Sequence, residues 1–210
     1  MTGAIVLCGG RSRRMGQPKA WLPFGPEVLL QRVVRILRDQ VGPVVVVASA
    51  DQNLPILPES VVVARDVIAD QGPLHGLATG LRAIPPKTEL VYLTATDAPF
   101  LQPGWIGRLV ELIGPADLAI PANEVLCYPL AAVYRAGPTR IEADNLLAQG
   151  HRRLLDLTGR LRTIRVDPED LRAIDPDLET LENLNTIEEY EQALRSRDRD
   201  RSERARRSDA

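Results

Sequence analysis

The sequence has very little cysteine, and its two cysteines lie far apart. Cys8 and Cys127 are the only thiols among 210 residues, and neither belongs to a CxxC pair or a cysteine–histidine cluster. Without such a pair or cluster, neither a disulfide framework nor a zinc site is expected. The sequence therefore excludes a disulfide-stabilised scaffold and favours a protein of the reducing cytoplasm.

Aromatic side chains and long apolar runs are also scarce. Aromatic residues make up 4% of the sequence and hydrophobic residues 44%, so we expect an aliphatic core. The first apolar run covers residues 4–8 and has no basic residue before it. Such a run is too short for a secretion signal or a membrane span. We therefore expect a soluble cytoplasmic protein with no membrane partner.

The sequence has almost no net excess of charge. Its 26 basic residues oppose 28 acidic ones, which gives no general attraction to nucleic acid or to an anionic membrane. The last sixteen residues are different, because they hold seven arginines interspersed with four acids. No apolar periodicity continues past Leu194. The sequence therefore predicts one domain over residues 1–195 and a charged, disordered tail over 196–210, with no nucleic-acid partner.

Apolar runs and amphipathic segments alternate along the chain. The predicted strands lie at 4–8, 44–48, 61–65 and 90–96, with further candidates at 117–122, 129–135 and 161–166. The predicted helices include 26–40, with its apolar face from Leu29 to Leu37, as well as 138–149 and 151–159. Thr186 and Glu189 form the capping-box pattern of a final helix. Strands that alternate with helices are typical of βαβ units, so we expect an α/β fold with a mostly parallel sheet.

The first predicted strand runs into the segment LCGGRSRRMGQPK, residues 7–19, which combines three glycines with four basic side chains. Glycine lets backbone N–H groups approach a ligand closely. The spacing fits neither a P-loop nor a GxGxxG fingerprint. Arginine binds oxygens in pairs and lysine binds as a point charge, so the loop is suited to several phosphates. Arg14 and Lys19 are the strongest candidates, whereas solvation explains Arg11 and Arg13 equally well.

A carboxylate follows the strand predicted at 90–96. Ligands of parallel α/β sheets bind at the carboxyl ends of the strands, so we expect Asp97 at the same edge as the glycine–arginine loop. Mg²⁺ typically takes one or two carboxylates together with phosphate oxygens. Asp97 is therefore a candidate Mg²⁺ ligand, although Asp-Ala-Pro after a strand is also typical of a simple turn.

Two further segments are candidates for ligand contact. In DVIADQGPLHGL, residues 66–77, Gly72 and Gly76 would let a flat ligand lie against the backbone, and Gly76 is expected to begin a helix. A solvated loop explains this segment equally well. Asn183 and Asn185 are two residues apart, so an extended chain presents both amides on one face. They would orient a second substrate or cap the following helix.

Taken in order, the motifs LCGGRSRRMGQPK, GPLHGL, ATDAPFL, GHRRL and ENLNT resemble those of the molybdenum cofactor guanylyltransferases, within the wider nucleotidyltransferase group. The resemblance covers residues 3–194 and implies a single Rossmann-like, three-layer domain. It also implies transfer of GMP from GTP to the phosphate of molybdenum-molybdopterin, release of pyrophosphate, and Mg²⁺ as cofactor. Molybdoenzymes or their chaperones are the protein partners that it suggests.

The resemblance also assigns roles to individual residues. Lys19 and Arg14 would stabilise the departing pyrophosphate, and Asp97 would hold Mg²⁺. The residues expected to bind the nucleotide are Leu7, Cys8, Gly9, Gly10, Lys19, Asp66, Gly76, Asp97, Asn183 and Asn185. Arg152 and Arg153 fall in the segment expected to face the pterin.

Some positions depart from the family pattern and leave alternatives open. Pro18 stands where family members usually carry aspartate, and residues 48–50 lack an asparagine that is common after the second strand. Gly9-Gly10 and GPLHG favour guanine, because both allow the backbone to meet a purine edge. A cytidylyltransferase, an enzyme for another phosphorylated acceptor, and a nucleotide-binding protein without turnover are the alternatives. Retention of Lys19 and Asp97 argues against the last.

Overall fold

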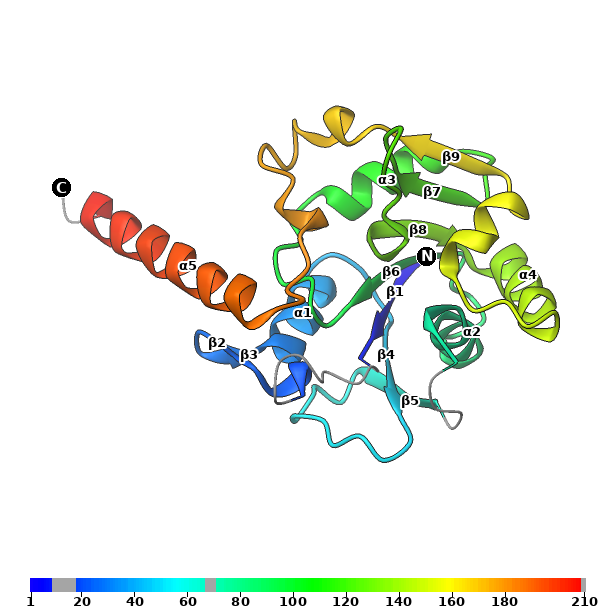
Figure 1. Ribbon diagram of the computed structural model, residues 1–210, viewed down its shortest axis with the longest axis horizontal. Helices are drawn as coiled ribbons and strands as arrows, with labels where there is room; N and C mark the ends of the chain where they lie inside the picture. Colours follow the sequence, from blue (N-terminus) through cyan, green and yellow to red (C-terminus); the bar gives the residue numbers. More distant parts are fainter. Residues whose placement is uncertain (9–17, 67–70, 209–210) are drawn as a thin grey trace.

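The computed structural model describes residues 1–8, 18–66 and 71–208. Within these ranges, seven strands form one sheet in the order β5-β4-β1-β6-β8-β7-β9, and β2 and β3 form a separate hairpin (Figure 1). The strands are β1 (Thr2–Leu7), β2 (Pro23–Phe24), β3 (Glu27–Val28), β4 (Val44–Ser49), β5 (Val61–Asp66), β6 (Leu90–Ala95), β7 (Leu118–Pro121), β8 (Ala132–Arg135) and β9 (Thr163–Val166). The predicted strands are thus present with slightly different ends, except that residues 129–131 of the candidate at 129–135 form a 3₁₀ turn and only Ala132–Arg135 is a strand.

The large sheet is mostly parallel, as the sequence predicts. β1 pairs in parallel with β4 and β6, β4 with β5, and β7 with β9. β8 lies between β6 and β7 and is antiparallel to both. The carboxyl ends of β1, β4, β5 and β6 therefore meet at one edge of the sheet, where a parallel α/β fold binds its ligands.

Helices cover both faces of this sheet. The helices are α1 (Leu29–Arg38), α2 (Pro73–Ala83), α3 (Trp105–Ile113), α4 (Ala136–Ala148) and α5 (Ile187–Ser208). Short 3₁₀ turns are η1 (Lys19–Trp21), η2 (Pro129–Ala131), η3 (Leu154–Gly159), η4 (Pro168–Leu171) and η5 (Glu179–Leu181). Apolar residues of α1 and α3 pack on one face, and those of α2 and α4 pack on the other (Figure 1). The predicted three-layer α/β domain is confirmed.

α2 lies unusually close to β1, because two glycines face that strand. A Cβ atom on Gly80 would lie 2.7 Å from the Ile5 side chain, and one on Gly76 would lie 3.0 Å from the Leu7 side chain. The helix begins at Pro73, so the prediction that Gly76 starts it was wrong. Gly76 lies in the second turn, where the absence of a side chain permits the close approach.

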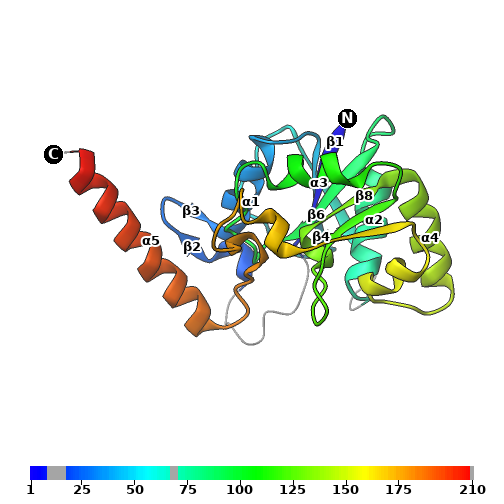
Figure 2. The same cartoon turned by 90° about the horizontal axis from the view of Figure 1, so that it is seen from above.

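α5 is the final helix that the sequence predicts. The predicted capping box is present, since Thr186 Oγ1 accepts from the Glu189 N–H at 3.2 Å and Glu189 Oε2 accepts from the Thr186 N–H at 3.0 Å. The helix does not end near Leu194, however, but continues to Ser208 and projects away from the domain (Figure 2). Arginine, glutamate and alanine, which are frequent in this segment, have high helix propensity.

The first turns of α5 are anchored on the β2–β3 hairpin. Tyr190 and Ala193 lie in a small apolar cluster with Phe24. The Tyr190 hydroxyl donates to the carbonyl of Pro23, and the Arg197 guanidinium lies over the Phe24 ring, 5.2 Å from its centroid. Within the part of the chain that the structure describes, no helix is long and apolar enough to cross a membrane.

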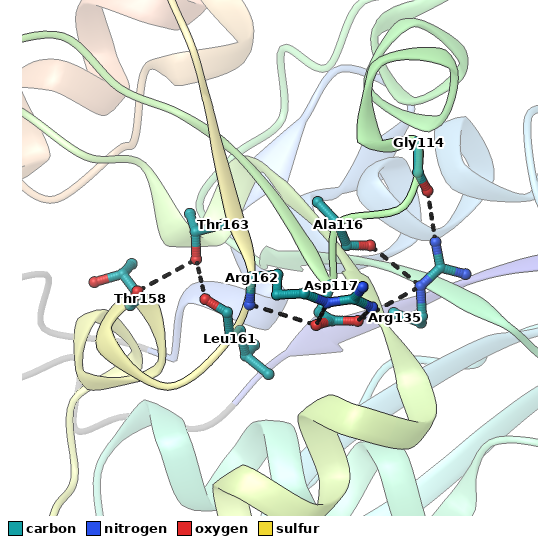
Figure 3. Close-up of polar contacts among 8 residues, drawn as sticks. All are labelled: Gly114, Ala116, Asp117, Arg135, Thr158, Leu161, Arg162 and Thr163. Carbon is teal, nitrogen blue, oxygen red and sulfur yellow. Dashed lines mark hydrogen bonds and ion pairs between the residues drawn. The ribbon is translucent and has the colours of Figure 1, made fainter.

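An ion-pair network connects three strands at the amino ends of β7 and β9, which is the edge of the sheet opposite the carboxyl ends of the parallel strands (Figure 3). Asp117 is buried just before β7, and Arg162 donates to its two carboxylate oxygens from Nε at 2.7 Å and from Nη2 at 2.8 Å. Arg135 Nε lies 3.8 Å from Asp117 Oδ1. The hydrogen bonds from Arg162 lower the Asp117 pKa, against the opposing effect of burial. The network joins the beginnings of β7 and β9 to the end of β8.

Candidate functional site

Three segments that are far apart in the sequence meet at the carboxyl edge of the sheet. Lys19 begins η1, Asp97 follows β6, and Asn185 precedes α5. Lys19 Nζ lies 2.5 Å from Asp97 Oδ2 and 3.5 Å from Asn185 Oδ1. A backbone hydrogen bond also joins two of these segments, because the Leu184 N–H donates to the carbonyl of Asp97 at 2.8 Å. The structure therefore brings together the candidate lysine, carboxylate and amide.

The Asp97 carboxylate is only half satisfied by the residues that the structure describes. Its Oδ2 accepts from Lys19, whereas its Oδ1 is buried and has no hydrogen-bond partner in that part of the chain. A buried carboxylate oxygen without a partner is costly, and such groups in native proteins call for a ligand or a functional reason. Asp97 Oδ1 is therefore suited to an incoming cation or hydrogen-bond donor.

The donor set at this edge is compatible with Mg²⁺. Mg²⁺ prefers oxygen ligands and is commonly held by one or two carboxylates plus substrate phosphates, rather than by a cage of protein groups. Among the described residues, no cluster of three or more acidic, histidine or cysteine side chains could hold a metal. A single carboxylate with a buried, unpaired oxygen, such as that of Asp97, fits a metal that arrives with a polyphosphate.

The backbone at the end of β1 is held in place by hydrogen bonds to residues in and just after the neighbouring strands β4 and β6. The Cys8 N–H donates to the carbonyl of Val47 at 2.8 Å, and the Thr96 N–H donates to the carbonyl of Leu7 at 3.2 Å. Gln52 Nε2 donates to the carbonyl of Cys8 at 2.9 Å. Burial raises the pKa of the Cys8 thiol, so this cysteine is a packing residue rather than a nucleophile. Sequence reasoning did not find Gln52, because nothing in its own segment indicates a partner 44 residues away.

A second acidic side chain lies at the same edge. Asp66 is the last residue of β5, and its Oδ2 is 3.0 Å from Nδ1 of His75 in the first turn of α2. Both side chains are largely buried, with 19% of Asp66 and 15% of His75 exposed. The sequence singled out Asp66 but gave no sign of this pairing.

The remaining candidates are distributed around this edge. Asn183 and Asn185 are exposed on either side of the buried Leu184, an alternation typical of an extended chain. Arg152 and Arg153 are exposed ahead of η3, and the carbonyl of Arg152 accepts from the Leu74 N–H at 3.2 Å. The candidates Gly9, Gly10 and Arg14 lie outside the described residues, as do Arg11 and Arg13.

The chain has an α/β fold, a class of protein in which ligands bind at the carboxyl ends of the parallel strands. The model of the family described as MobA-like NTP transferase domain matches residues 4–164 of the chain. The chain belongs to this family, and it is a nucleotidyltransferase. The family resemblance drawn from the sequence is thereby confirmed.

Individual relatives agree with this assignment. A probable molybdenum cofactor guanylyltransferase of Pelotomaculum thermopropionicum is 35% identical over 184 residues, covering 87% of this chain and 86% of that protein. The fold is similar to that of molybdopterin-guanine dinucleotide biosynthesis protein A from Archaeoglobus fulgidus, with a TM-score of 0.76, 23% identity, and coverage of 95% and 100% of the two chains. A manganese complex of Rv0371C from Mycobacterium tuberculosis has a TM-score of 0.58 at 17% identity, with 93% and 98% covered.

Proposed function

We propose that this chain transfers GMP from GTP to the terminal phosphate of molybdenum-molybdopterin, giving molybdopterin guanine dinucleotide and pyrophosphate. The observation that carries the proposal is the cluster of Lys19, Asp97 and Asn185, with a buried carboxylate oxygen unpaired among the described residues. The names of the curated relatives support guanine as the base and the molybdenum cofactor as the acceptor. The product would pass to molybdoenzymes or their chaperones in the cytoplasm.

In this proposal, Lys19 acts on the donor phosphates. A phosphate oxygen of the acceptor attacks the α-phosphorus of GTP, and the bond from that phosphorus to the bridging oxygen of pyrophosphate breaks. Negative charge then develops on the leaving pyrophosphate. A fixed ammonium group stabilises such charge without forming a covalent bond. Lys19 is held in place by Asp97 and Asn185, so it is positioned before the donor arrives.

Asp97 is the residue that would hold Mg²⁺. When bound, Mg²⁺ would neutralise charge on the donor phosphates and help to orient them. The backbone carbonyls of Leu7 and Cys8 are fixed by Thr96 and Gln52, which makes the end of β1 a rigid wall for the base. Asn185, exposed beside Lys19, would contact one of the two substrates.

The experiment is to compare Lys19→Ala with a matched lysine variant in an assay of pyrophosphate release from GTP with molybdenum-molybdopterin as acceptor. Lys87 is the other lysine of the sequence and is exposed just before β6, at the opposite edge of the sheet. We expect Lys19→Ala to lower kcat by at least about a hundredfold, with an unchanged melting temperature. Lys87→Ala should behave as wild type. A near-normal rate for Lys19→Ala would reject the proposed role of this cluster.

A panel of the four nucleoside triphosphates in the same assay tests the base. GTP should support transfer, and CTP, ATP and UTP should not. A preference for CTP would make the chain a cytidylyltransferase with the same fold and the same edge chemistry.

A further inference from the structure

We propose that His75 is a positioning residue for the donor nucleotide: its ring holds the carboxylate of Asp66 in the orientation that contacts GTP. This inference rests on the proposed function and on the family resemblance, which implies that Asp66 contacts the nucleotide. It assigns a role to His75 in addition to the residues of the proposed function. The sequence pattern does not indicate the contact between His75 and Asp66, because one lies in α2 and the other ends β5.

The geometry defines the direction of the hydrogen bond. His75 Nδ1 lies 3.0 Å from Asp66 Oδ2, which is an ordinary hydrogen-bond distance. A carboxylate can only accept, so the proton of this bond is on Nδ1 of the imidazole. Both side chains are largely buried, so water competes weakly for the bond, and one rotamer of Asp66 is favoured over the others.

The imidazole is itself fixed, because the first turn of α2 is held from two sides. On one side, Gly72 has a φ of +80°, and a Cβ there would lie 2.8 Å from the Arg152 carbonyl oxygen, which also accepts from the Leu74 N–H. On the other side, Gly76 rests against Leu7 of β1. A group held by such contacts does not have to be ordered when a ligand binds, which preserves affinity.

The packing of α2 does not depend on this bond. The helix is attached to the sheet through the buried residues Leu74, Leu77 and Leu81, which belong to a large apolar cluster. Asp66 lies at the end of β5, an edge strand of the sheet. Loss of the imidazole should therefore remove this hydrogen bond, and with it part of the orientation of the Asp66 carboxylate, while the domain remains folded.

The test compares His75→Ala, His75→Asn and Arg82→Ala by calorimetric titration with GTP and by steady-state transfer kinetics. Asparagine keeps an N–H donor on the atom attached to Cγ, at the place of Nδ1. Arg82 is the matched control, because it lies on the same helix and pairs with an acid, Asp144 of α4, away from the site.

We expect His75→Ala to raise the Kd and the KM for GTP by about tenfold, the effect of losing one charge-assisted hydrogen bond. kcat and the KM for the acceptor should change by less than about twofold, because the alanine variant retains Lys19 and Asp97. His75→Asn should recover most of the affinity. Arg82→Ala should match wild type, and all three variants should unfold cooperatively.

Three results would overturn the inference: GTP affinity of His75→Ala equal to wild type, a fall in kcat with an unchanged KM for GTP, or His75→Asn no better than His75→Ala. Failure of the proposed function looks different. A wild-type chain that binds GTP but transfers nothing to molybdenum-molybdopterin would reject the acceptor and leave the calorimetric test of His75 intact. A wild-type chain that binds no nucleotide would reject both.

Discussion

Two aspartates at opposite edges of the same sheet have basic partners but are satisfied to different degrees. At the amino edge, both carboxylate oxygens of Asp117 accept from Arg162 (Figure 3). At the carboxyl edge, Lys19 contacts one oxygen of Asp97, and the other oxygen is buried without a partner among the described residues. The two carboxylates carry the same charge, and Asp117 is buried whereas Asp97 is partly buried. They differ most in which oxygen atoms lack a hydrogen-bond partner.

Under the proposed function, this difference separates a structural ion pair at Asp117 from a ligand-binding carboxylate at Asp97. A fully hydrogen-bonded carboxylate joins strands and has no capacity for a ligand. A carboxylate with a buried, unpaired oxygen lowers the stability of the free protein and regains that loss when a ligand binds. The contrast between Asp117 and Asp97 thus indicates which edge performs chemistry.

The largest expected effect follows from removing the charge of Asp97. Asp97→Asn should lower kcat/KM for transfer by about a hundredfold or more, because the amide is a poor metal ligand and no longer positions Lys19. The melting temperature should stay close to that of wild type. The check is a rate assay with a parallel thermal scan, and a large loss of stability would place Asp97 among the structural carboxylates.

The opposite pattern is expected at the amino edge. Arg162→Ala would leave the buried Asp117 carboxylate without its bidentate donor, so the melting temperature should fall by roughly 4–8 °C. Transfer activity at 25 °C should be unchanged, because the network is at the far edge of the sheet. Calorimetric melting measures the first quantity. If Arg162→Ala also loses transfer activity, the Asp117 network affects the catalytic edge, which would contradict a purely structural role for this network.

The same network makes a prediction for pH dependence. The Asp117 pKa is lower in the folded protein than in the unfolded chain because of the hydrogen bonds from Arg162, so the unfolded chain binds the proton more tightly. The stabilisation is therefore complete above the unfolded pKa and is lost as the pH falls below about 4. Urea unfolding of wild type and Asp117→Asn should show a free-energy difference that is constant near neutral pH and shrinks in acid. A difference that grows in acid would contradict this assignment.

The smallest effect is expected from the end of α5. Tyr190 and Arg197 attach this helix to the β2–β3 hairpin, close in sequence to Lys19. Deletion of residues 198–210 retains both contacts and should change kcat/KM by less than about twofold. A deletion from residue 187 should lower activity, because it removes Tyr190. A strong effect of the shorter deletion would show that the end of the helix binds a partner.

Much of this arrangement could be predicted from the sequence, because it follows from strand direction and apolar runs. Parallel strands gather their carboxyl ends, so Lys19 and Asp97 had to lie near one another. The capping box of α5 was predictable for a different reason, because it depends only on two residues three positions apart, Thr186 and Glu189. The position and direction of β8 were not predictable, since its apolar pattern is the same whichever way the strand runs.

Other features could not be predicted from the sequence, because they depend on contacts between segments that are brought together only in the folded protein. The run at 61–65 reads as a buried strand, but β5 lies at the sheet edge, and Val62 and Val63 are each 39% exposed. The partners of Cys8 and Asp66, namely Gln52 and His75, belong to segments that only the fold brings together. Sequence patterns record burial and periodicity, whereas these contacts depend on which loops meet.

The central claim is that Asp97 binds the metal–nucleotide complex and Asp117 does not. The most direct measurement is a calorimetric titration of Asp97→Asn and Asp117→Asn with GTP, with Mg²⁺ and again with EDTA. We predict that wild type and Asp117→Asn bind GTP more tightly with Mg²⁺ than with EDTA, and that Asp97→Asn shows the same weak affinity in both. Full metal-dependent binding by Asp97→Asn would contradict the assignment of this edge as the site of nucleotidyl transfer.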